Sequence, residues 1–132
     1  ITVLSTIAAQ RAAMLDSIDV AAGDARRRFV SPGDLVDEEY RQAADAVARW
    51  RAAGSPADDV PPEIQAGADY SEITAEQAAV EIETTAAGYA QAMAAIRELR
   101  LAGKRATREC ADADIDSTGQ GVINQLVAIT PP

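Results

Sequence analysis

The chain has 132 residues and a mass of 13.8 kDa, enough for one modest domain, and 48% of its residues are hydrophobic but only 4% are aromatic. Alanine accounts for 30 residues whereas Leu, Ile, Val and Phe together number 26, so the side chains available for a core are few and small. The net charge of −9 opposes binding to nucleic acid or to an anionic membrane, and no apolar stretch approaches the ~18 to 20 residues that span a bilayer.

Residues 1–54 predict an antiparallel helical hairpin. Apolar residues follow one helical stripe over 6–30, and the sequence Ser-Pro-Gly-Asp at 31–34 favours a chain reversal in which Asp34 caps the next helix. A second helix is expected from about residue 34 to 53. Its heptad seam supplies four candidate packing or interface residues, which are Val36, Tyr40, Val47 and Trp50.

Residues 55–73 predict an acidic loop, because prolines and acidic side chains interrupt the helical spacing, with at most one helical turn at 62–66. Thr74 and Gln77 have the spacing of a capping box and predict the start of a long helix over 74–111. Its apolar stripe supplies further candidate packing or interface residues: Ile82, Tyr89, Met93 and Ile96. We expect Trp50 and Tyr89 to pack in the core rather than to stack on a ligand.

The last segment, residues 112–132, predicts a turn through Gly119 followed by a short C-terminal helix. The expected fold is therefore all-α, with a helical hairpin, an acidic loop, one long helix and a short C-terminal helix. We expect these elements to form a single domain over residues 1–132.

Acidic and basic residues occupy different parts of the chain. No basic residue occurs between Ala52 and Ile96, whereas basic residues gather at 26–28 and in the C-terminal half of the long helix. This arrangement complements helix dipoles, and a second interpretation is that the opposite patches orient a partner or a neighbouring copy. The candidate acidic contact patch comprises Asp58, Asp59, Glu63, Asp69 and Glu72.

No complete motif for catalysis occurs in the sequence. The chain has no histidine, which removes the usual general base and the commonest transition-metal ligand, and Cys110 is the only thiol. Asp112, Asp114 and Asp116 resemble the start of a calcium loop, but Ser117 and Ile123 stand where that loop needs Gly and Glu. We expect no enzymatic activity, no metal site and no cofactor.

Six segments, together with Tyr40, are similar to segments of a known family: IDVAAGDAR at 18–26, VSPG at 30–33, AAGSPA at 52–57, PEIQA at 62–66, TAEQAA at 74–79 and RELRLAGK at 97–104. Their order resembles an α-helical region of tail-fibre and other tail-associated proteins of tailed bacteriophages. The resemblance covers most of residues 14 to 106.

The resemblance implies a non-enzymatic structural or assembly component of a phage tail, made in the bacterial cytoplasm and located in the virion. Its partners would be other tail proteins or copies of itself, and the fibre stalks of the family imply a trimer. The thin core favours the same view, because a long helix with few large side chains gains by packing against another subunit. The alternative is a small acidic phage-encoded inhibitor whose carboxylates imitate phosphates when it binds a host or competitor protein.

Overall fold

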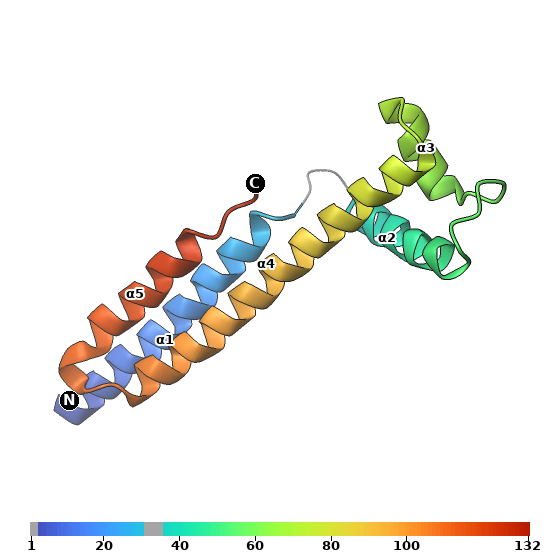
Figure 1. The fold of residues 1–132 in the computed structure, drawn as a ribbon. Coiled ribbons are helices and arrows are strands. Elements are labelled where there is room, and N and C mark those ends of the chain that lie inside the picture. Colours follow the sequence, from blue (N-terminus) through green and yellow to red (C-terminus); the bar gives the residue numbers. More distant parts are fainter. Residues whose placement is uncertain (1–2, 31–35) are drawn as a thin grey trace. The chain divides into compact units, whose positions relative to one another are not determined.

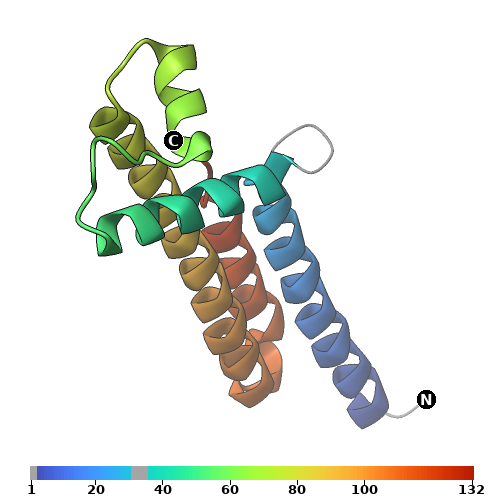
Figure 2. The ribbon, with the colours of Figure 1, turned by 90° about the vertical axis from the view of Figure 1, so that its right-hand side faces the viewer.

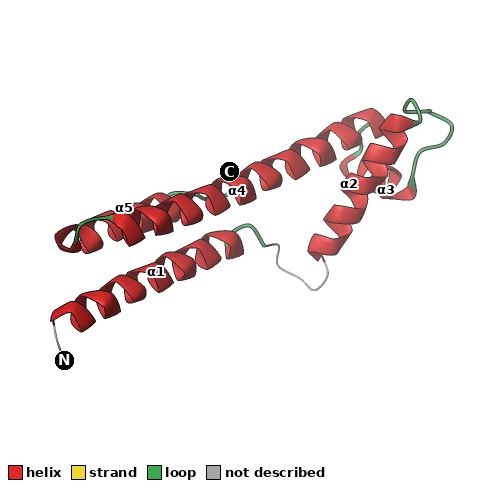
Figure 3. Ribbon diagram, turned by 90° about the horizontal axis from the view of Figure 1, so that it is seen from below, coloured by secondary structure: helices red, strands yellow, loops and turns green. Residues whose placement is uncertain are grey.

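The computed structural model describes residues 3–30 and 36–132, and every regular element in these ranges is helical (Figures 1 and 3). The all-α class predicted from the sequence is confirmed, as are the long helix and the short C-terminal helix. By its contacts the chain divides into two compact units. The first comprises residues 1–30 and 91–132, and the second comprises residues 31–90.

The first unit is a bundle of three helices that lie side by side (Figures 1 and 2). They are α1 (Val3–Arg27), the C-terminal part of α4 (Ala75–Glu109) and α5 (Ile115–Val127), which follows a short 3-10 turn at Asp112–Asp114. The C-terminal part of α4 runs antiparallel to the other two helices. The buried core of this unit contains Ile18, Ala22, Ala25, Ile96, Val122 and Leu126.

Two glycines let α5 approach its neighbours closely. A Cβ atom at Gly103 of α4 would lie 2.3 Å from a methyl carbon of Val122, and one at Gly119 would lie 2.1 Å from Cγ of Met14. Both positions therefore require a residue without a side chain. The predicted turn through Gly119 is wrong, since α5 already begins at Ile115 and Gly119 lies inside it, facing α1.

Two arginines of the N-terminal segment bind the carbonyl ends of the other helices. Arg11 donates hydrogen bonds to the carbonyl oxygens of Thr107, at 2.7 Å, and of Cys110, at 3.0 Å, at the end of α4. Arg28 donates to the carbonyl oxygen of Leu126, at 2.7 Å, near the end of α5. Carbonyl groups in the last turn of a helix lack partners within that helix, so these guanidinium groups satisfy them and tie the three helices together.

The second unit contains α2 (Val36–Ala52), α3 (Pro62–Ser71) and the N-terminal part of α4. Acidic residues open α2 and basic residues close it, an order that complements the helix dipole. The side chains that form the core of this unit come from all three helices: Val47, Trp50, Ile64, Ala68, Ala78 and Ala79.

Helix α3 lies within the segment predicted as a loop and is longer than the single turn expected at 62–66. Pro62 occupies the start of the helix, where the absence of an N–H costs nothing. Ile64 and Ala68, four residues apart, are both buried, and Glu72 ends the helix with a left-handed φ of 56°. Burial of these two side chains on one face therefore stabilises a helix in a segment whose composition favours a loop.

The helix bounds otherwise fall within a few residues of the predicted ones. The helix expected over 6–30 is found at Val3–Arg27, and the long helix ends at Glu109 rather than at 111. The expected turn at 31–34, with its cap Asp34, lies outside the described residues. Because α1 and α2 belong to different units, the helical hairpin expected over 1–54 and the single domain expected over 1–132 stay predictions. Among the described residues, no helix has the length and apolar character needed to cross a membrane.

Candidate interaction surfaces

Most of the candidate packing residues lie in the two cores. Val47 and Trp50 are buried in the second unit, and Ile82 is half-buried against them. Ile96 is fully buried in the first unit, and Met93 packs beside it. These five residues therefore stabilise their own units.

Three candidates lie apart from the cores. Tyr40 is 56% exposed and Tyr89 is 51% exposed, while Val36 is half-buried. The expectation that Tyr89 packs in the core is wrong, because neither core cluster includes a residue from the stretch of α4 between Ile82 and Met93. As interface residues, Tyr40 and Tyr89 stay predictions.

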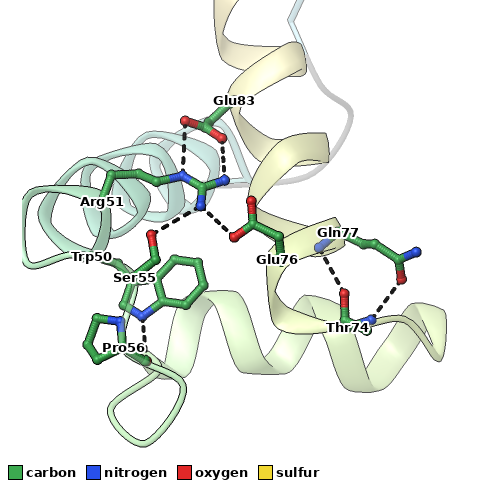
Figure 4. A network of polar contacts seen from close by, with 8 residues as sticks. All are labelled: Trp50, Arg51, Ser55, Pro56, Thr74, Glu76, Gln77 and Glu83. Carbon is green, nitrogen blue, oxygen red and sulfur yellow. Dashed lines mark hydrogen bonds and ion pairs between the residues drawn. The ribbon is translucent and has the colours of Figure 1, made fainter.

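Arg51, near the end of α2, organises a polar network with the start of α4 (Figure 4). Its guanidinium lies 2.5 Å from a carboxylate oxygen of Glu76 and 2.8 Å from one of Glu83, and it donates a hydrogen bond to Oγ of Ser55 at 3.1 Å. The Arg51 guanidinium carbon is also 5.3 Å from the ring centroid of Trp50, within the range of a cation–π contact. One arginine thus holds two turns of α4 against α2.

The charges of this network favour its ionised state. The hydrogen bond from Arg51 holds the pKa of Glu76 below its usual value, and bonds to Glu76 and Glu83 raise the pKa of Arg51 further. Sequence patterns did not indicate the network, because Arg51 and its partners are 25 and 32 residues apart. Helical periodicity relates only residues on the same helix.

The capping box predicted at the start of α4 is confirmed. The N–H of Thr74 donates to the side-chain oxygen of Gln77 at 3.0 Å, and the N–H of Gln77 donates to Oγ1 of Thr74 at 3.1 Å (Figure 4). Two N–H groups that the helix itself cannot satisfy are therefore bonded.

The five residues of the acidic contact patch are all exposed, in the α2–α3 connection, on α3 and just after it. Within the described part of the chain none of them forms an ion pair. The second unit carries thirteen acidic and three basic residues, a net charge of −10, whereas the first carries eight acidic and nine basic residues, a net charge of +1. The net negative charge of the protein therefore comes from residues 31–90, because the acidic and basic residues of the first unit nearly balance.

The first unit contains an ion-paired cluster between α1 and α4. The carboxylate of Asp19 lies 2.7 Å from Nε of Arg100 and 2.7 Å from the ammonium of Lys104. The hydrogen bond from Lys104, with that from Arg100, keeps the pKa of Asp19 below its usual 3.8 although partial burial opposes the shift. This cluster is a helix-to-helix link, because each carboxylate oxygen of Asp19 on α1 pairs with a cationic side chain of α4.

The aspartates that resemble a calcium loop point to different partners. Asp112 pairs with Arg11 at 2.6 Å, and Asp116 accepts a hydrogen bond from Gln10 at 3.1 Å. Over residues 3–30 and 36–132, no three potential metal-ligating side chains gather at one place. These carboxylates therefore fasten the α4–α5 connection to α1.

Four apolar residues of α4, two in each unit, are exposed outside its buried stripe. Val80, Ala87, Ala94 and Leu101 follow one another at intervals of seven, and each is exposed. Val80 is 48% exposed and Leu101 is 40% exposed. Leu101 also lines an open hollow on the helix surface with Ala102, Arg105, Ala106 and Glu109. Val80 and Ala87 belong to the second unit, and Ala94 and Leu101 belong to the first.

Comparisons of this chain with protein-family models, with curated proteins and with solved structures found no match. Its function is therefore inferred from the surfaces described above and from the resemblance of its segments.

Proposed function

We propose that the chain is a non-enzymatic structural or assembly component of a bacteriophage tail, in the fibre or at the baseplate, and that it acts through protein–protein contacts. The observation that carries the proposal is the match between segments that resemble tail proteins and the joints of this fold.

Three of the six segments that resemble tail proteins coincide with joints of this fold. The segment 74–79 contains the capping box of α4, and the segment 62–66 contains the first turn of α3. The segment 52–57 contains Gly54 and Ser55, which reverse the chain after α2 with positive φ angles of 88° and 54°. Because these positions determine where helices begin and end, the resemblance concerns architecture rather than alanine content alone. This supports a shared helical design.

The charge distribution supports a protein partner. A surface with a net charge of −10 on residues 31–90 repels phosphate, so nucleic acid is an unsuitable ligand for it. We therefore propose that the chain is made in the host cytoplasm and contacts other tail proteins or copies of itself in the virion.

Mass spectrometry of purified particles tests the tail assignment. Particles of a phage that encodes the chain should contain it, and deletion of its coding sequence should yield particles with defective tails. Presence only in tail-assembly intermediates would identify an assembly role.

The assignment is contradicted if the chain is missing from particles and intermediates and deletion leaves infectivity unchanged. In that case its recovery in a stoichiometric complex with a host enzyme would favour the acidic inhibitor instead. The Asp24→Asn variant, which changes a surface outside the acidic contact patch, serves as the control for expression of the chain.

A further inference from the structure

We propose that a basic stripe on the first unit is the docking site for the acidic contact patch of a second copy of this chain. The stripe belongs wholly to the first unit and consists of one residue of α1 and four of α4: Arg26, Arg97, Arg100, Lys104 and Arg108. The acidic contact patch belongs wholly to the second unit. This inference deepens the proposed function by naming a partner, and it rests on that function only in taking copies of the chain as partners.

The four basic residues of α4 lie on one side of the helix. At 3.6 residues per turn, positions 97, 100, 104 and 108 fall within a sector of about 80°. Glu98 and Glu109 are the acidic residues of the same part of α4, and they lie outside this sector. On α4 the stripe is therefore uniformly basic.

Helix α1 extends the stripe. Asp19 pairs with Arg100 and Lys104, each at 2.7 Å, and these contacts place one line of α1 beside the stripe. Arg26 lies seven residues beyond Asp19 on the same line, toward Arg97, because the two helices are antiparallel. The stripe and Asp19 together carry five positive charges and one negative charge.

Most of this positive charge is not neutralised within the described part of the chain. Arg97 and Arg108 are exposed, Arg26 is half-buried, and none of the three forms an ion pair among the described residues. Arg100 and Lys104 share a single carboxylate. Because a guanidinium group binds a carboxylate through paired hydrogen bonds, the stripe suits an acidic protein surface.

The acidic contact patch has the charge and the length that this stripe requires. Its carboxylates are exposed and form no ion pair among the described residues. From Glu63 to Glu72, α3 and its end span about 14 Å, and from Arg97 to Arg108, α4 spans about 16 Å. Because every copy carries both surfaces and the two surfaces differ, the contact is head-to-tail and requires no other molecule.

Reversal of the charge on each surface, followed by mixing, tests the contact in the full-length chain. The stripe variant carries Arg97→Glu and Arg108→Glu. The patch variant carries Asp69→Lys and Glu72→Lys at the C-terminal end of α3, where lysine suits the helix dipole. In sedimentation the wild-type chain should associate, and each variant alone should associate at least tenfold more weakly. An equimolar mixture should restore the wild-type affinity, because the intact stripe of one variant meets the intact patch of the other.

Two further measurements separate this contact from other causes of association. Arg49→Glu reverses an exposed arginine of α2 that forms no ion pair among the described residues, and it should leave the dissociation constant unchanged. An increase in salt from about 50 mM to about 500 mM should weaken wild-type association at least tenfold, because salt screens exposed charges. Unaltered circular dichroism would show that all variants remain folded.

A monomeric wild-type chain, an affinity that salt leaves unchanged or a mixture that fails to associate would overturn the proposal. Double-stranded DNA bound by a monomeric wild-type chain but not by the stripe variant would assign the stripe to a polyanion instead. A monomer found in virions would overturn the docking contact and leave the tail assignment standing. Restored association in a chain absent from virions and assembly intermediates would do the reverse.

Discussion

The hydroxyl of Thr107 is a buried polar group of the first unit. The residue is fully buried, and no described group forms a hydrogen bond with Oγ1. Burial of an unsatisfied hydroxyl costs about 1 to 3 kcal/mol. We therefore expect Thr107→Val to raise the free energy of unfolding by about 1 kcal/mol in a urea titration. A decrease in the free energy of unfolding would show that the hydroxyl of Thr107 forms a hydrogen bond in solution.

Two glycines of α5 give opposite expectations although they are two residues apart. Gly119 faces Met14 without room for a Cβ atom, so Gly119→Ala should lower the free energy of unfolding by about 1 to 3 kcal/mol. A Cβ atom added at Gly121 would have no neighbour within 4 Å, so Gly121→Ala should raise that free energy by up to about 1 kcal/mol through better helix propensity. Thermal unfolding of the two variants measures the contrast, and equal effects would contradict the close approach of α1 and α5.

At the scale of elements, the link between α1 and α4 should make stability depend on acid. The pKa of Asp19 is lower in the folded chain than its usual 3.8, so the folded state favours the ionised carboxylate. The stabilisation is present above pH 3.8 and is lost as the pH falls through the folded pKa. Asp19→Asn should therefore lower the midpoint of thermal unfolding at pH 7 and flatten its decrease below pH 3.8.

Asp24→Asn is the matched control for this experiment, because the partner of Asp24 is Arg27 of the same helix and no interhelical contact is lost. If Asp19→Asn retains the full acid dependence of the wild-type chain, the contact with Arg100 and Lys104 does not stabilise the fold.

Local patterns were sufficient to predict the long helix and its start. Thr74 and Gln77 satisfy each other within one turn, so the capping box could be recognised from adjacent sequence alone. The burial of Trp50 followed in the same way from the seam of its own helix. These features depend on residues no more than a few turns apart.

The features that sequence patterns did not indicate depend on contacts between distant segments. A glycine favours a turn, but it also permits close packing, and only the position of Met14 shows that Gly119 does the latter. Tyr89 has the helical spacing of a core residue but lies where neither core cluster reaches. For the same reason no pattern indicated that Arg51 pairs with Glu76 and Glu83.

At the scale of the whole molecule, the presence of two cores predicts that damage in one unit is felt mainly there. Trp50 is buried in the second unit and Ile96 in the first, and truncation of either to alanine should cost about 2 to 5 kcal/mol. Amide hydrogen exchange should show faster exchange within 36–82 for Trp50→Ala, and within α1, α5 and 93–109 for Ile96→Ala. Equal acceleration over both units would show that they unfold as one.

Each core contains few large side chains, while Val80 of the second unit and Leu101 of the first are exposed to solvent in the single chain. We propose that the chain compensates for these small cores by packing against other tail proteins or copies of itself. Sedimentation equilibrium of the full-length chain decides whether it associates with itself. We expect the mass of two or more 13.8 kDa chains at micromolar concentration, and a single-chain mass up to the highest soluble concentration would contradict self-association.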